Sequence, residues 1–256
     1  MDQGADKATR YRRIMIKLSG GAMAGSDTIF DQAAIEHIVD QILSAVDLGC
    51  AVAIMVGGGN IFRGNVAAKW HIERAEADNM GMLGTVINGV MLRAAINARI
   101  QTDVRVMTAI SINQIAEPYI RLRADRHLDK GSIVILVGGI GQPYVTTDYP
   151  AVQRALELRC DAILAAKHGV DGVFTDDPKT NPKAKRYRSL TFDEVIRRDL
   201  RVMDQSAMLL ARDHALPIHL FNFDQPGRIR DICLGRDVGT YIGVDAKTLL
   251  AEDSAG

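Results

Sequence analysis

Cysteine, net charge and long apolar runs are all scarce in this chain, and each scarcity excludes a class of protein. The 3 cysteines, Cys50, Cys160 and Cys233, lie far apart among apolar residues, which argues against a disulfide framework and against a zinc site. We therefore expect buried free thiols in a reducing compartment, the cytoplasm. The 31 basic and 31 acidic residues balance, so no overall field attracts nucleic acid or a membrane surface.

Apolar residues never gather in a run that approaches the ~20 residues a membrane span needs. The segment from Met1 to Arg13 is polar and charged, without the apolar centre of a signal peptide. The sequence therefore predicts neither export nor membrane anchoring.

Short apolar runs alternate with amphipathic stretches along the 256 residues, 47% of which are hydrophobic. The spacing of apolar residues from Ile35 to Val46 and from Leu83 to Ala94 follows one face of a helix. This alternation predicts an α/β fold, a three-layer sandwich in which helices cover both faces of a mostly parallel central sheet. The runs that we expect to form its strands are Ile14–Leu18, Ala51–Val56, Val104–Thr108, Ile133–Val137, Ala162–Ala166 and Ile218–Phe221.

The chain reads as one folding unit. We expect a flexible segment over residues 1–10, a domain over residues 11–243 and a frayed tail over residues 244–256. Two prolines and many polar residues predict a long surface loop from Thr175 to Ser189. Thr191 with Glu194 three residues later predicts a capping box that starts another helix.

Ligands of such sheets bind where the carboxyl ends of the strands open into loops. The first strand ends in Lys17 and runs into Ser19, Gly20 and Gly21, which places a lysine beside free backbone N–H groups and suits a phosphate. This is not the P-loop pattern, so we expect a different kind of phosphate-binding site. A lysine beside glycines is common, so this segment taken by itself leaves a purely structural role open, just as a tight turn with a solvated arginine stays open for the next glycine turn.

Two further strand exits are rich in glycine. Gly57, Gly58 and Gly59 can form an anion-binding nest, and Arg63 can supply a planar fork for a phosphate. The exit after Ile133–Val137 continues to two threonines and Asp148. That aspartate either organises a lysine or a magnesium ion, or caps the next helix, which we expect over Ala151–Leu158.

The exit of the fifth strand carries Lys167 and His168. ATP-dependent phosphoryl transfer needs positioning and charge neutralisation more than proton removal, so we do not assign His168 as a general base. Two anion-binding turns with a lysine and an arginine nearby predict a reaction between two phosphorylated molecules. Lys17, a magnesium ion and Arg63 can offset the charge of the transition state.

Six motifs occur together in this chain, in the order KLSG (Lys17–Gly20), GGGNIFRG (Gly57–Gly64), ADNMGMLGTVING (Ala77–Gly89), QPYVTTD (Gln142–Asp148), GVDGVFTDDP (Gly169–Pro178) and LRVMD (Leu200–Asp204). In order and spacing they resemble the bacterial UMP kinases, from about Tyr11 to about Ile242. The resemblance implies the amino acid kinase fold, a homohexamer, magnesium-dependent use of ATP and a place in pyrimidine nucleotide synthesis. It assigns no metal ligand to the protein itself, since magnesium arrives with ATP.

The resemblance also implies roles for individual residues. Catalysis falls to Lys17, with Asp148 organising the site and Lys167 as a second cation. The residues implied for ATP are Lys17, Ser19, Gly20, Gly59 and Arg63 at its phosphates and His168, Phe174 and Asp177 near its base. Those implied for UMP are Gly58, Asp78 at the ribose, Ile140, Gly141, Gln142, Pro143, Tyr144, Val145, Thr146 and Thr147.

Four features depart from the pattern of that family. Gly21 stands where an acid is usual, and Ile140 and Gln142 stand where a threonine and an asparagine are usual. The segment from Ser26 to Phe30 lacks the glycines of the stretch associated with GTP activation, so regulation by GTP or UTP stays open. The leading hypothesis is transfer of the γ-phosphoryl group of ATP to UMP. The alternatives are a related kinase with another phosphorylated or carboxylated acceptor, and a nucleotide-binding storage or regulatory protein without catalysis.

Overall fold

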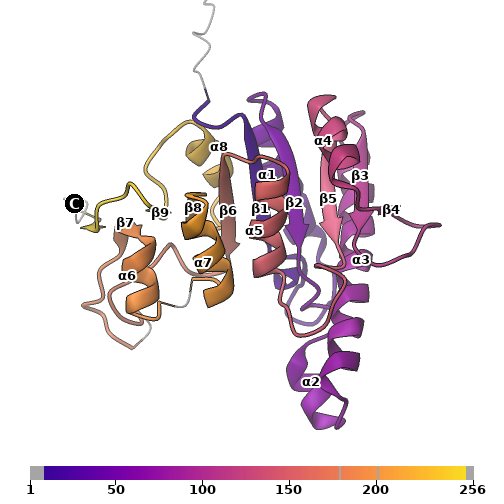
Figure 1. Ribbon diagram of the computed structural model, residues 1–256, viewed down its shortest axis with the longest axis horizontal. Helices are drawn as coiled ribbons and strands as arrows, with labels where there is room; N and C mark the ends of the chain where they lie inside the picture. Colours follow the sequence, from indigo (N-terminus) through magenta and orange to yellow (C-terminus); the bar gives the residue numbers. More distant parts are fainter. Residues whose placement is uncertain (1–8, 179, 201, 252–256) are drawn as a thin grey trace, which may run out of the picture.

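Strands from the whole length of the chain form a single sheet in the computed structural model, which describes residues 9–178, 180–200 and 202–251 (Figure 1). In this part of the chain the strand order is β10-β7-β9-β8-β6-β1-β2-β5-β3-β4, and only β8–β9 and β10–β7 pair antiparallel. The strands are β1 (Arg13–Leu18), β2 (Ala51–Val56), β3 (Val104–Thr108), β4 (Glu117–Pro118), β5 (Ile133–Val137), β6 (Ala162–Lys167), β7 (Tyr187–Thr191), β8 (Ile218–Asn222), β9 (Thr240–Gly243) and β10 (Leu249–Leu250).

Helices cover both faces of the sheet, which confirms the predicted three-layer α/β fold. Buried residues of α1, α3 and α8 pack on one face, and those of α4, α5, α6 and α7 pack on the other. The helices are η1 (Gly20–Met23, a 3-10 turn), α1 (Gln32–Val46), α2 (Gly64–Lys69), α3 (Arg74–Asn97), α4 (Arg121–Asp129), α5 (Asp148–Glu157), α6 (Phe192–Arg197), α7 (Gln205–Asp213) and α8 (Arg228–Cys233). In this part of the chain, no helix combines the length and the apolar character that crossing a membrane requires.

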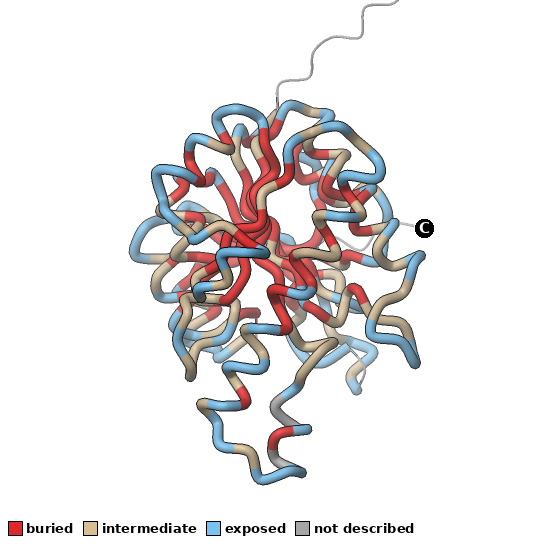
Figure 2. The backbone as a smooth tube through the Cα atoms, turned by 90° about the vertical axis from the view of Figure 1, so that its right-hand side faces the viewer, coloured by how far each residue is buried: buried red, intermediate tan, exposed pale blue. Residues whose placement is uncertain are grey.

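The alternation of side chains along the central strand divides the core into two halves. Ile14, Ile16 and Leu18 of β1 belong to the cluster under α1 and α3, whereas Met15 belongs to the cluster under α5 and α7. Figure 2 shows the buried residues gathered along the strands, with exposed residues on the outer turns. The three cysteines are buried and free, as expected.

Of the features predicted outside the main strands, the helix cap at Thr191 is confirmed, whereas the surface loop and the tail are corrected. The Thr191 side chain accepts a hydrogen bond from the N–H of Glu194 at 3.1 Å, as the predicted cap requires. The predicted surface loop is corrected at its end, because β7 begins at Tyr187. The prediction of a frayed tail is corrected for Leu249–Leu250, which pair with β7; residues 1–8 and 252–256 lie outside the described residues.

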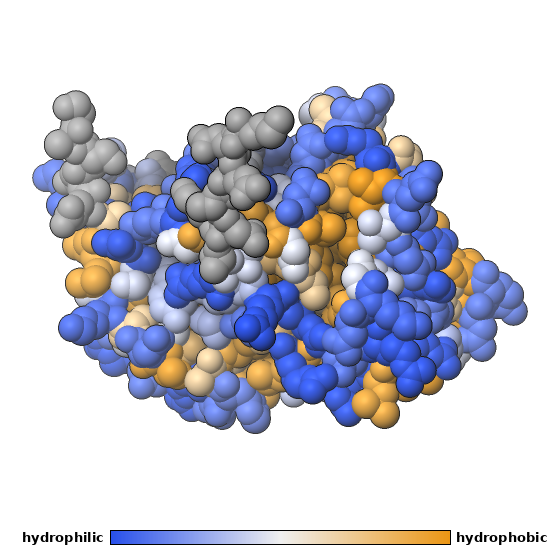
Figure 3. Space-filling model, turned by 90° about the horizontal axis from the view of Figure 1, so that it is seen from above, coloured by the Kyte–Doolittle hydropathy of each residue, from blue (hydrophilic) through white to orange (hydrophobic). Residues whose placement is uncertain are grey.

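The edge of the sheet at which the strands begin is held by ion pairs. Arg13 contacts Asp125 and Asp129, each at 2.6 Å, and the N–H groups of Arg12 and Arg13 donate to Asp161. Figure 3 looks onto this edge and shows mostly hydrophilic side chains with apolar ones between them. The opposite edge, where α2 and the first turns of α3 project beyond the strands (Figure 1), therefore remains for ligands.

His219 of β8 is a buried ionisable group that holds the amino end of the chain. Its Nε2 lies 2.7 Å from the hydroxyl of Tyr11, and only 3% of the residue is exposed. Burial, reinforced by the nearby guanidinium of Arg10, lowers the pKa of His219 to about 3. The folded chain therefore keeps this imidazole neutral at pH values where the unfolded chain protonates it.

We expect this histidine to make the protein less stable in mild acid. The folded pKa is depressed, so the free energy of unfolding decreases as the pH falls below 6.5, by about 2 kcal/mol at pH 5. Replacing His219→Gln, which can still bond Tyr11 but does not titrate, should flatten urea-unfolding free energies between pH 7 and 5. His214→Gln, at an exposed position, should leave that slope unchanged. A slope that survives in H219Q would contradict the assignment.

Candidate active site

A lysine–aspartate pair lies at the centre of the carboxyl edge of the sheet. The alternation along β1 directs Lys17 to the face covered by α5, and its Nζ lies 2.5 Å from Oδ1 of Asp148. Their side chains are 11% and 13% exposed, so the pair is largely withdrawn from water. A charged side chain that is largely buried needs a partner of opposite charge, so each of the two residues holds the other in position.

The amino end of α5 explains why Asp148 occupies this position. Thr147 is the N-cap and Asp148 is the first helical residue. The alternative interpretation of Asp148 as a cap is therefore wrong. A carboxylate in the first turn is favoured by the helix dipole, and its second oxygen accepts the N–H of Asp204 at 3.1 Å.

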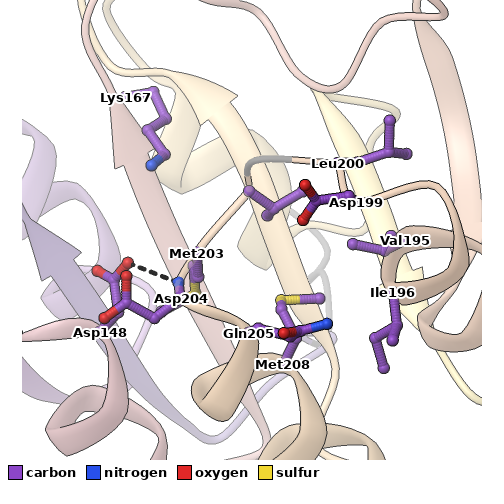
Figure 4. Close-up of a pocket in the computed structure, with 11 residues that line it drawn as sticks. Asp148, Lys167, Val195, Ile196, Asp199, Leu200, Met203, Asp204, Gln205 and Met208 are labelled. Carbon is purple, nitrogen blue, oxygen red and sulfur yellow. Dashed lines mark hydrogen bonds between the residues drawn. The ribbon is translucent and has the colours of Figure 1, made fainter.

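Lys167 at the end of β6 adds a second cation on the same face of the sheet. It lines a cavity of about 310 Å³ together with Asp148, Met203 and Asp204 (Figure 4). Burial and the nearby charge of Lys17 lower the pKa of Lys167. Asp204, at the start of α7, accepts a hydrogen bond from the Thr146 hydroxyl and thereby joins α7 to the loop before α5.

A larger cavity, of about 780 Å³, adjoins the lysines on the side of α1. Both Lys17 and Lys167 line it, and Ser19, Arg63 and His168 are also in its wall, so the predicted phosphate-binding side chains share one space. His168 Nδ1 lies 2.7 Å from Oδ1 of Asp224, which also accepts the N–H of Gly169 through its other oxygen.

The first two glycine turns pack directly against each other. A Cβ at Gly20 would lie 2.6 Å from the nitrogen of Gly59 and equally close to the Asn60 side chain. A Cβ at Gly58 would lie 2.4 Å from the carbonyl oxygen of Gly81 in α3. Glycine is therefore required at both places for the strands to approach α3 and each other.

The third glycine turn leads to the residues implied for UMP. Gly138, Gly139 and Gly141 have positive φ angles of 75°, 56° and 80°, which strongly favour glycine. Further along, the N–H of Tyr144 donates to Oδ2 of Asp78 at 2.7 Å. The structure thus brings the loop of residues 140–147 to Asp78 on α3, although the two are distant in the sequence.

Comparison with known proteins adds to this geometry. A model of the amino acid kinase family matches residues 12–222. The chain belongs to the amino acid kinase family. Its sequence is 56% identical to a uridylate kinase of Frankia alni over 234 residues, 91% of each chain. It is 43% identical to a uridylate kinase of Streptococcus thermophilus over 239 residues, 93% of this chain and 97% of the relative.

Solved structures are also similar to this chain. A UMP kinase from Bacillus anthracis superposes with a TM-score of 0.93 and 59% identity, over 94% of this chain and 99% of that one. A uridylate kinase from Archaeoglobus fulgidus has a TM-score of 0.69, covering 90% of this chain and 99% of that one, but only 22% identity. The second likeness supports the fold alone.

Other residues of the predicted site do not line either of the two cavities. Phe174 is half-buried and Asp177 is exposed in the loop before β7, and neither lines these cavities. The same holds for the loop of Ile140, Gly141, Gln142, Pro143, Tyr144, Val145, Thr146 and Thr147. These residues remain predictions as ligands of ATP and UMP.

Several residues of the site carried no assigned role in the sequence. Asp204 is the last residue of the motif LRVMD. That motif contributed to the resemblance to a family but did not predict a contact with Asp148. Asp224 follows β8 and holds His168. Thr85 and Asn88, inside the third motif, contact the glycine turns from α3. Strand-end position could have indicated Asp224, but no local signal indicates the other contacts.

We expect Lys17 and Asp148 to be coupled in stability. Lys17→Met or Asp148→Asn alone leaves one charge unpaired in a largely buried position, and each should lower the free energy of unfolding by about 3 kcal/mol. The double variant should lose clearly less than the sum, as measured by urea unfolding. Additive losses would show that the two charges do not depend on each other.

Proposed function

We propose that this protein transfers the γ-phosphoryl group of ATP to UMP, giving ADP and UDP. The observation that carries the proposal is the buried Lys17–Asp148 pair beside Lys167, at the edge where three glycine turns converge. The relatives named uridylate kinase and UMP kinase, similar over almost their whole length, support the same reaction. A reaction that yields UDP belongs to pyrimidine nucleotide synthesis, and the free buried cysteines fit a cytoplasmic location.

The two nucleotides are assigned to different sets of residues, which adjoin in the turn after β2. ATP phosphates lie against Lys17, Ser19, Gly20, Gly59 and Arg63, with the base toward His168, Phe174 and Asp177. UMP lies against Gly58, Asp78 and the loop of residues 140–147. In support, Ser19, Arg63 and His168 share a cavity with both lysines, and Asp78 already contacts that loop.

Charge neutralisation is the main task of these side chains. In the transfer, the bond from the γ-phosphorus to the β–γ bridging oxygen breaks and a bond to a phosphate oxygen of UMP forms. The acceptor phosphate is largely deprotonated at neutral pH, so no general base is needed. We assign to Lys17 and Lys167 the task of offsetting the charge on the transferred group, and the ion pair of Lys17 with Asp148 supports this role.

A divalent metal accompanies the nucleotide, and we assign it as Mg²⁺. Among the described residues, no group of three or more His, Cys, Asp or Glu side chains could hold a metal ion. Both oxygens of Asp148 are already engaged, by Lys17 and by the N–H of Asp204. The donor set therefore fits a metal held mainly by phosphate oxygens, and Asp204 is a further carboxylate that lines the same cavity as Asp148. Magnesium bound there would neutralise charge on the β- and γ-phosphates.

We further propose that the protein acts as a homo-oligomer, a hexamer of this chain. Helix α3 exposes a row of apolar side chains, with Met80, Leu83 and Ile87 exposed by 37%, 49% and 48%. Exposed apolar side chains at helical spacing are typical of surfaces that bury against another copy. Sedimentation should give a multiple of the 27.9 kDa chain mass, and Leu83→Glu should lower it. A wild-type mass of one chain would contradict the proposal.

Turnover with a panel of acceptors tests the reaction. We expect ADP release from ATP with UMP to exceed that with CMP, dUMP, GMP or no acceptor, and to stop when a chelator removes Mg²⁺. Lys17→Ala should reduce kcat by about 100-fold or more, because a charge aimed at the transferred group is lost. The same variant should still bind UMP, since Lys17 is assigned to ATP.

Each other outcome has a distinct meaning. Faster turnover with another phosphorylated acceptor would show that the protein is a kinase with a substrate other than UMP. Ile140 and Gln142 would then explain the change of acceptor. Tight binding of ATP without any acceptor-dependent ADP release would favour the non-catalytic binding protein.

A further inference from the structure

We infer that helix α3 holds the turn after β2, where Gly58 is assigned to UMP and Gly59 to ATP, and the turn after β5, which leads to the UMP loop, at a fixed separation. Thr85 and Asn88 are the positioning residues. The inference rests on the proposed function, because it uses the assignment of the two nucleotides to these turns. Neither residue lines the two cavities beside the lysines, so each would act through the backbone that it holds.

Thr85 holds the turn that follows β5. Only 3% of the residue is exposed, and its Oγ1 accepts the N–H of Gly138 at 2.6 Å. The same hydroxyl donates to the carbonyl oxygen of Met82 at 2.7 Å, which fixes the direction of its lone pairs. Gly138 is the first residue past the strand and has a positive φ, so this bond sets the course of the loop toward UMP.

Asn88 holds the turn that follows β2. It is fully buried, and its Nδ2 donates to the carbonyl oxygen of Gly57 at 2.6 Å and to Oδ1 of Asn60 at 2.7 Å. Asn60 returns a bond from its own Nδ2 to Oδ1 of Asn88 at 3.0 Å. The pair of amides therefore brackets Gly58 and Gly59 from both sides.

Close packing leaves this turn little freedom to move toward α3. A Cβ on Gly58 would lie 3.0 Å from the nitrogen of Thr85, in addition to its contact with Gly81. Thr85 and Asn88 are three residues apart and lie on the same face of one helix. A single rigid element thus contacts both turns through buried side chains.

Separation of the two turns matters because the phosphoryl group passes between them. In-line transfer requires the attacking and leaving oxygens to be aligned, and a displacement of about 1 Å can cost about 100-fold in rate. A positioning role therefore predicts a change in substrate kinetics, whereas a purely structural role predicts only a less stable protein.

The experiment compares Thr85→Val with Thr85→Ser in the full chain. Valine keeps the shape of threonine but removes the acceptor for Gly138, and serine restores it. We expect T85V to raise KM for UMP and lower kcat/KM for UMP by about 10- to 100-fold, with KM for ATP nearly unchanged. T85S should recover most of that loss.

Ser132→Ala is the matched control at the other end of β5. Ser132 is 5% exposed, and its hydroxyl donates to Asp103 at 3.0 Å, so its removal also costs a hydrogen bond, one that is partly buried. We expect S132A to lower the melting temperature but to leave kcat and both KM values unchanged. The control separates lost stability from lost positioning.

Asn60→Ala gives a second, independent readout if T85V does not fold, because Asn60 is only half-buried. It should raise KM for both ATP and UMP, because Gly59 and Gly58 of the turn after β2 are assigned to the two nucleotides, whereas T85V should raise KM for UMP alone. Wild-type turnover with UMP together with unchanged KM values in T85V and N60A would overturn the positioning role alone. A wild-type protein without UMP-dependent turnover would refute the proposed function instead.

Discussion

The ion pair between Lys17 and Asp148 is the constraint from which the arrangement of the site follows. A lysine at the end of a central buried strand needs a counter-charge, and the first turn of α5 supplies it through Asp148. The same carboxylate accepts the N–H of Asp204 and so sets the start of α7. Lys167 lines the same cavity as Asp148 and Asp204, and burial and the charge of Lys17 lower its pKa while the two carboxylates act in the opposite direction.

Much of the fold could be predicted from the sequence because the apolar runs of a parallel sheet are a local signal. The six expected strands all occur, each with ends within one residue of the prediction, and Thr191 caps the next helix as predicted. The short strands β4, β7, β9 and β10 were not predicted. Two-residue strands carry no recognisable period, and β7 follows directly on a polar loop whose composition masks it.

The candidate site was predictable as a set of strand ends but not as a set of contacts. Lys17, Asp148 and Lys167 follow from their places at the carboxyl edge, whereas the bonds from Thr85 and Asn88 join residues 53 and 31 positions apart. Composition cannot show such pairings. The structure also explains what Gly21 changes, since a Cβ there would face the Arg63 guanidinium at 3.6 Å. A side chain at that position would reach Arg63, and this chain leaves Arg63 bonded to Gly59 alone among its described hydrogen bonds.

Both margins of the sheet end in strands of two residues, β4 at one side and β10 at the other. An open margin invites another chain to continue the ladder, and a margin this short offers almost no unpaired backbone for that purpose. The ends of the sheet are therefore poor templates for fibre-like growth, in which each molecule adds to the next without limit. Association is left to helical surfaces, whose contacts can close on themselves into a finite, symmetric particle.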